Sequence, residues 1–131
     1  MRVFIDTNVL VSAFATRGLC ADVLRLVLAS HELVTSELVI DELERVLRDK
    51  LAVPTGLVAE ASDFMREYVV MPRSAARPDV NLADDADAEI LAAAIASEAE
   101  ALVTGDGDLL GVAGQIEPLR IVSPRGFWEL H

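Results

Sequence analysis

The sequence is poor in the residues that form disulfides and zinc sites. Cys20 is the only cysteine among 131 residues, which excludes an internal disulfide and a multi-cysteine zinc site. The only histidines are His31 and His131, so a zinc centre with the usual His and Cys ligands is also not expected. A chain of this length and hydrophobic content can fold around its own core, and its cysteine usage indicates a reducing compartment.

Long hydrophobic runs and basic residues are also scarce. Only three apolar residues separate Arg2 from Asp6, which does not resemble a secretion signal, and no apolar run approaches membrane-spanning length. We therefore expect a cytoplasmic protein with no membrane association. The 11 Lys and Arg residues stand against 22 Asp and Glu residues, for a net charge of −11. This charge argues against capture of nucleic acid by a broad basic surface and favours a basic protein partner.

Short apolar segments alternate with helical patterns along the whole chain. Five segments are typical of buried strands, at residues 3–5, 32–36, 68–71, 101–104 and 119–122. Helical spacing is found between and after them, most clearly over 21–28, 37–50, 57–67 and 84–96. This order predicts a single domain over residues 1–131. Its fold class is α/β, a three-layer α/β/α sandwich with a mostly parallel central sheet of about five strands.

Capping residues and prolines indicate where several helices begin. Thr7 or Asn8 is expected to cap the first helix, and Asp108 is placed to cap a short helix after the fourth strand. Pro54 and Pro124 suit the first turn of a helix. Residues 72–83 have no periodicity and are expected to form a loop that carries Arg73 and Arg77.

Four acids are expected to meet at one edge of the sheet. Asp6 and Asp106 follow two of the predicted strands, and Glu42 and Asp87 lie on the apolar faces of two predicted helices. Carboxylates that gather without lysine or histidine suit a hard cation with oxygen ligands, Mg²⁺ or Mn²⁺. Such a cation can promote attack of water on a phosphodiester. Three nearby residues are suited to hydrogen-bond the carboxylates: Thr7, Asn8 and Thr104.

Each of these residues also has a simpler interpretation. Asp6 could simply be the cap of a helix, and Glu42 could pair with an arginine in the core. The acids at 84, 85 and 87 could all favour a helix N-terminus through its dipole, so Asp84 and Asp85 compete with Asp87 for the third position. Three arginines could hold RNA phosphates or lie on solvated loops: Arg17, Arg73 and Arg77.

Four segments together resemble the PIN-domain family. They are Ile5–Leu10, the helix containing Glu42, Asp87–Ala93 and Val103–Leu109, in the order that the family has them. The resemblance covers essentially the whole chain, and its VapC-like branch implies a metal-dependent ribonuclease, often the toxin of a toxin–antitoxin pair. It implies that Asp6, Glu42, Asp87 and Asp106 bind the metal and that Asp108 assists them. RNA would be the substrate and an antitoxin protein the partner, and a homodimer is expected.

Two rival functions remain open at the level of sequence. A phosphatase of the haloacid-dehalogenase type also places an acid after a strand, but it requires a second acid where this chain has Asn8 and a well-placed lysine, and Lys50 is the only lysine. The other rival is a non-catalytic PIN-like module that binds a regulatory or RNA-processing complex. The intact set of four acids favours the enzyme over this module.

Overall fold

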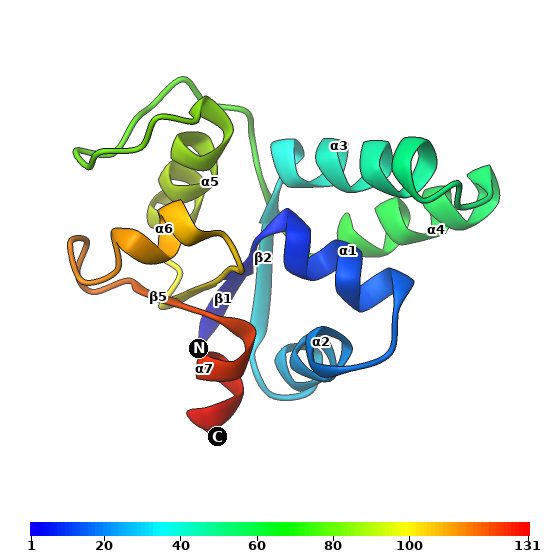
Figure 1. Cartoon of the computed structure of the whole chain (residues 1–131), viewed down its shortest axis with the longest axis horizontal. Coiled ribbons are helices and arrows are strands. Elements are labelled where there is room, and N and C mark those ends of the chain that lie inside the picture. The colour runs from blue at the N-terminus through cyan, green and yellow to red at the C-terminus, as the bar shows by residue number, and fades with distance from the viewer.

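The computed structural model describes residues 1–131, and its helices and strands alternate as the sequence predicts (Figure 1). The strands are β1 (Arg2–Ile5), β2 (Glu32–Ser36), β3 (Val69–Met71), β4 (Ala101–Val103) and β5 (Arg120–Val122). The helices are α1 (Thr7–Ala15), α2 (Leu19–Ser30), α3 (Glu37–Arg45), the π-helical turn η1 (Val46–Lys50), α4 (Thr55–Met65), α5 (Asp85–Ala96), α6 (Gly107–Gly111) and α7 (Pro124–Glu129).

All five strands are parallel and form one sheet in the order β3-β2-β1-β4-β5. The central strand is β1, whose Val3, Phe4 and Ile5 have no exposed surface. A strand buried on both faces must be apolar throughout, which explains why this segment lacks polar alternation. The predicted mostly parallel sheet of five strands is therefore confirmed.

Helices cover both sides of this sheet. In Figure 1, α1 to α4 lie to the right of β1 and β2, whereas α5 and α6 lie to the left, and α7 lies below. This arrangement agrees with the predicted three-layer α/β/α sandwich, whose core contains 32 buried hydrophobic residues from the strands and the facing helices. No helix is both long and apolar enough to cross a membrane.

Several predicted boundaries differ from the structure. Asp6, not Thr7 or Asn8, caps α1, because its extended backbone lets its own carboxylate accept the N–H of Thr7. The predicted helix over 37–50 is present, but its hydrogen bonds change to a π pattern at Val46. Pro54 precedes α4 as its cap instead of opening its first turn, whereas Pro124 does begin α7.

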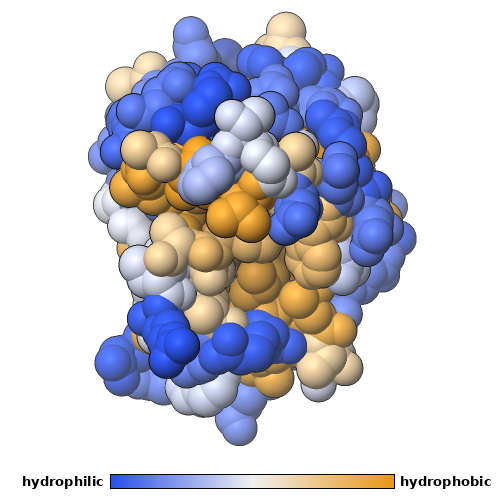
Figure 2. Space-filling view, turned by 90° about the vertical axis from the view of Figure 1, so that its right-hand side faces the viewer, coloured by the Kyte–Doolittle hydropathy of each residue, from blue (hydrophilic) through white to orange (hydrophobic).

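One side of the molecule carries a hydrophobic hollow, which is visible in Figure 2 between two hydrophilic regions. It lies between the end of α1, the turn η1 and α4, and its volume is about 360 Å³. Its lining includes Phe14, Leu47, Leu57 and Phe64, with Glu60 as its one acidic member. Leu57 is 54% exposed, so this apolar surface is open to solvent.

The buried hydroxyl of Thr35 on β2 allows a test of the packing. Its Oγ1 has no hydrogen-bond partner, although the residue is completely buried. Replacing an unsatisfied hydroxyl with a methyl group of similar size removes a desolvation penalty, so Thr35→Val should raise the free energy of unfolding by about 1 kcal/mol. Urea denaturation measures this change.

Thr104 provides the matched control because it is equally buried but fully hydrogen-bonded. Its Oγ1 donates to Asp6 and accepts from the backbone N–H of Asp106. Thr104→Val should therefore lower the free energy of unfolding by about 1–3 kcal/mol. Equal losses of stability in Thr35→Val and Thr104→Val would contradict this assignment.

Candidate functional site

The site lies where the strand order of the sheet reverses. From β1 the chain moves outward through β2 and β3, and then returns to place β4 on the other side of β1. Such a reversal leaves a crevice at the carboxyl ends of the two central strands, which is where open parallel sheets bind ligands. Asp6 follows β1 directly, and its backbone N–H donates to the carbonyl of Val103 at the end of β4 at 2.9 Å.

Asp6 is held in place by Thr104, which follows β4. The hydroxyl of Thr104 donates to Oδ2 of Asp6 at 2.6 Å, and the backbone N–H of Thr7 donates to Oδ1 at 2.7 Å. The same Thr104 hydroxyl accepts the backbone N–H of Asp106 at 2.9 Å. A single threonine therefore fixes the two acids that leave the central strands.

Glu42 is linked to Asp6 through Thr7, the first residue of α1. The Thr7 hydroxyl donates to Oε1 of Glu42 at 2.9 Å, which joins the first turn of α1 to the half-buried face of α3. Glu42 forms no ion pair with an arginine, so the structural alternative considered for it is not observed. The interaction is instead a hydrogen bond between two residues that lie 35 positions apart.

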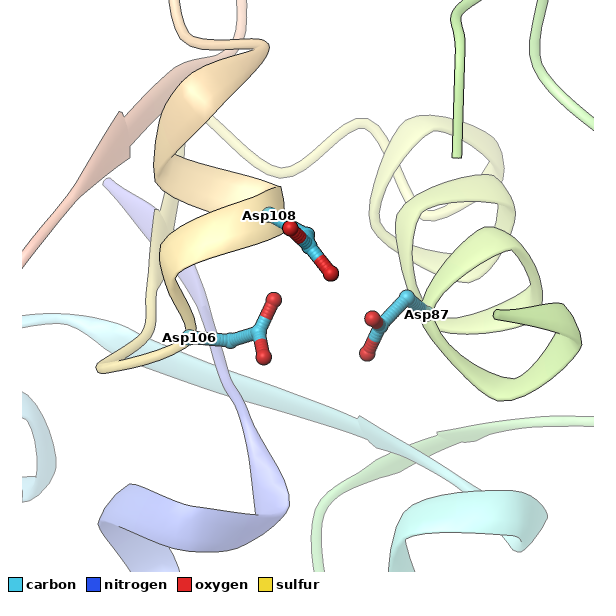
Figure 3. A group of neighbouring side chains, drawn as sticks. All are labelled: Asp87, Asp106 and Asp108. Carbon is cyan, nitrogen blue, oxygen red and sulfur yellow. The ribbon is translucent and has the colours of Figure 1, made fainter. Parts of the chain in front are cut away.

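The remaining acids form a cluster between α5 and α6. One carboxylate oxygen from each of Asp87, Asp106 and Asp108 lies within 4.8 Å of the others. Figure 3 shows the three side chains pointing toward one another from the first turn of α5 and the start of α6. Asp106 also caps α6 by accepting the N–H of Leu109, so the cap expected from Asp108 is supplied by Asp106.

Burial and mutual repulsion raise the pKa values of three of these acids. Loss of solvation is the largest cause for each of Asp6, Glu42 and Asp87. The pKa of Asp87 rises from 3.8 to about 6, with further contributions from the negative charges of Asp106, Asp84, Asp6 and Asp108. Hydrogen bonds from Thr104 and Thr7 oppose the rise for Asp6, and the bond from Thr7 opposes it for Glu42.

Neighbouring polar residues take other roles. Asp84 caps α5 by accepting the N–H of Asp87, and Asp85 pairs with Arg77. These contacts leave Asp87 as the member of its acidic run that faces Asp106. Asn8 is exposed and makes no hydrogen bond to the carboxylates, unlike Thr7 and Thr104.

The loop arginines are engaged with acids of the chain itself. Arg73 donates from Nε to Glu89 at 2.8 Å and lies 3.8 Å from Asp41. The other loop arginine, Arg77, binds the carbonyl of Leu82 at 2.7 Å in addition to its acidic partner. The guanidinium groups thus attach the loop at residues 72–83 to α5, whereas Arg17 is exposed and forms no ion pair.

The donor chemistry of the cluster fits a divalent cation. Its ligand atoms are all carboxylate oxygens, the set that Mg²⁺ and Mn²⁺ prefer. None of the acids at positions 6, 42, 87, 106 and 108 forms an ion pair, although seven ion pairs exist elsewhere in the molecule. A cation would therefore supply the positive charge that the chain does not.

Two further polar side chains near the cluster were not expected from the sequence. Asn81 of the loop and Gln115, which follows α6, line a polar pocket together with Asp108. They lie 34 positions apart and belong to segments without periodicity, so no local pattern indicates that they meet. The only indication in the sequence that these two residues belong to the site is that each lies near an acidic segment along the chain.

The raised pKa of Asp87 predicts how stability depends on pH. The native state holds a proton on Asp87 at pH values where the unfolded chain has lost it, so stability should fall as the pH rises from about 4 to about 6. Asp87→Asn should remove about 1 kcal/mol of this fall, less than the full linkage value because solvent screens a half-buried group. Urea denaturation across this pH range provides the measurement.

The control is Asp63→Asn, which makes the same charge change on the exposed surface of α4. Its pH dependence should follow that of the unmodified protein. A pH profile of Asp87→Asn that also matches the unmodified protein would show that Asp87 is not the group responsible.

Comparisons with known proteins agree with the observed fold. The structure of VapBC2 from Rickettsia felis, bound to a DNA fragment from their promoter, contains a chain that is 17% identical, with a TM-score of 0.64 over 94% of this chain and 98% of that one. VapC20 of Mycobacterium tuberculosis, a toxin that cleaves the sarcin-ricin loop, is 18% identical, with a TM-score of 0.59 over 81% and 91%. No curated protein matches the sequence. Residues 2–108 match the PIN domain, and the chain therefore belongs to the PIN-domain family.

Proposed function

We propose that this PIN-domain protein is a metal-dependent endoribonuclease and the toxin of a toxin–antitoxin pair. The observation that carries the proposal is the group of carboxylates at the switch point of the sheet, none of which is neutralised by a cation of the chain. Mg²⁺ or Mn²⁺ would be held by Asp6, Glu42, Asp87 and Asp106, with Asp108 as an additional ligand. The phosphatase alternative is set aside because it requires an acid where this chain has Asn8.

The protein's own contribution to the reaction is to hold these carboxylates in a fixed arrangement. A divalent cation supplies the electrophilic chemistry when bound, since it polarises a phosphoryl oxygen and lowers the pKa of water. Thr104 orients Asp6 and the backbone of Asp106, while Thr7 orients Glu42. Hydrogen bonds of this kind fix the direction in which a carboxylate presents its oxygens. Hydrolysis would leave a 5′-phosphate and a 3′-hydroxyl.

RNA would have to be held locally, because the net charge of −11 repels a polyanion. Arg73 and Arg77 could contribute only by exchanging their present partners for phosphates. Arg17 has no such partner and is free to contact RNA. We further propose that two copies form a homodimer with an RNA-binding groove between them. Light scattering tests the dimer by measuring the molar mass of the protein in solution.

A cleavage assay tests the proposed reaction. The protein is incubated with transfer RNA, ribosomal RNA and unstructured RNA in Mg²⁺ or Mn²⁺. Asp6→Asn should reduce cleavage at least about 100-fold, because it removes a metal ligand at the end of the central strand. A chelator should abolish cleavage, and the products should carry 5′-phosphates.

The control Asp63→Asn should cleave as the unmodified protein does. Mn²⁺ should also raise the melting temperature of the protein, since a ligand that binds only the native state stabilises it. Absence of both cleavage and stabilisation would overturn the proposal in favour of the non-catalytic binding module. Cleavage that persists in Asp6→Asn would contradict the assigned site.

The hydrophobic hollow between α1 and α4 supports the proposal of an antitoxin partner. It exposes apolar side chains such as Leu57 and Phe64 beside Glu60. An apolar segment with a basic flank would match this lining and the acidic surface of the chain. We propose that the antitoxin places such a segment in the hollow.

Leu57→Glu tests this contact because it adds a charge to the open part of the hollow. Co-purification with the protein encoded by the adjacent reading frame should fall at least tenfold, since burying an unpaired carboxylate is strongly unfavourable. Leu130→Glu serves as the control, because it adds the same charge at a leucine that is 49% exposed and lies outside the hollow. Undiminished capture of the antitoxin by Leu57→Glu would exclude the hollow as its binding site.

A further inference from the structure

A second pocket lies beside the acidic cluster. It is about 410 Å³ in volume and is formed by the loop that precedes α5 and by one side of α6 and the turn after it. Asn81 and Ala83 contribute from the loop, and Gly107, Gly111 and Gln115 from the other side. Asp108 belongs both to this pocket and to the acidic cluster, so the two are continuous. This volume is within the range of about 300–1,000 Å³ that is usual for small-molecule sites.

Neither the backbone conformation nor a lack of space requires glycine at two positions of the pocket. Gly107 and Gly111 lie one helical turn apart, neither has a left-handed backbone, and no atom lies within 4 Å of a Cβ built on either. Glycine in a helix is less stable than alanine by up to about 1 kcal/mol. Both glycines line the pocket and have open space around the Cβ position, so a side chain at either one would occupy room that is now free.

The wall of the pocket that belongs to the loop is held in place. Leu82 is only 5% exposed and anchors the loop in the core, while its carbonyl accepts a hydrogen bond from Arg77 at 2.7 Å. The two residues on either side of Leu82 are exposed and line the pocket. Asn81 is therefore presented from a segment that is fixed by both packing and hydrogen bonding.

The polar groups of the pocket suit a neutral ring with donors and acceptors. The side-chain amides of Asn81 and Gln115 make no hydrogen bond within the protein, and each offers both a donor and an acceptor. Asp108 is the only charged residue of the lining, and no arginine or lysine is present. A phosphate would be repelled here, whereas the edge of a nucleobase can pair with amides of this kind.

We infer that this pocket binds a single unstacked nucleobase next to the phosphate that is cleaved, with Asn81 and Gln115 pairing with its edge and the glycines supporting its face. The inference rests on the proposed nuclease function and adds the part of the substrate that determines specificity. Single-stranded RNA presents such bases, because they are free to leave the stack.

Nucleotide binding tests the pocket without any chemistry. Protein labelled with ¹⁵N is titrated in Mg²⁺ with the four nucleoside 5′-monophosphates and with ribose 5-phosphate, followed by NMR. At least one nucleotide should bind five times or more tighter than ribose 5-phosphate, and the side-chain amides of Asn81 and Gln115 should shift. Equal binding of all five ligands, or shifts confined to the acidic cluster, would overturn the inference.

Gly111→Leu fills the pocket without changing any acid. It should abolish the advantage of the nucleotides over ribose 5-phosphate. Gly56→Leu in α4 is the matched control, because that glycine also has open space around its Cβ and lies outside the pocket. Gln115→Leu provides a second variant on a residue outside the helix, and melting temperatures verify that each variant is folded. Preserved nucleotide preference in both pocket variants would overturn the inference.

Cleavage then separates this inference from the function on which it rests. If the unmodified protein cuts RNA, Gly111→Leu should change the base preference next to the cut, whereas Gly56→Leu should not. Cleavage with an unchanged preference in Gly111→Leu would overturn the pocket and leave the nuclease standing. Base-selective binding in the pocket, without cleavage of any RNA and without stabilisation by Mn²⁺, would support the pocket and overturn the nuclease.

Discussion

The pairing of β1 with β4 is the constraint on which the site depends. It joins residues about 100 positions apart. The hydrogen bond from the N–H of Asp6 to the carbonyl of Val103 extends the ladder of the two strands as far as the first acid of the site. The hydroxyl of Thr104 then links the two acids that leave these strands. Because both strands are buried in the core, the positions of these carboxylates are fixed by the packing of the sheet and not by flexible loops.

This arrangement places like charges together at a cost in stability. Burial and repulsion raise the pKa values of Asp6, Glu42 and Asp87, and none of the three forms an ion pair with a lysine or arginine. Hydrogen bonds from two threonines recover part of that cost. The apolar core supplies the rest of the stability, which allows the acids to remain together without ion-pair partners. If the site binds a divalent cation as proposed, it exchanges some stability of the free protein for affinity toward metal.

The surface of the molecule points to binding by local contacts. With a net charge of −11, the chain has no broad field to attract RNA, and its loop arginines Arg73 and Arg77 are paired with acids. What it presents instead are a polar pocket with unpaired amides beside the acids and a hydrophobic hollow on the side of α1 and α4. The two surfaces are formed by different elements, so the proposed substrate and the proposed protein partner would be recognised by separate groups.

Much of the fold was predictable from the sequence, because hydrophobic periodicity and strand length are local properties. The alternation of strands and helices, the buried β1 and the acids that follow β1 and β4 were all read correctly. Local patterns assigned the cap of α6 to Asp108 instead of Asp106, and they could not show that Arg73 binds Glu89. Only the tertiary structure placed Asn81 and Gln115 in one pocket, because this depends on how a loop packs near the distant segment that follows α6. The sequence by itself determined which side chains were available and where strands ended, whereas long-range packing decided which of them face one another.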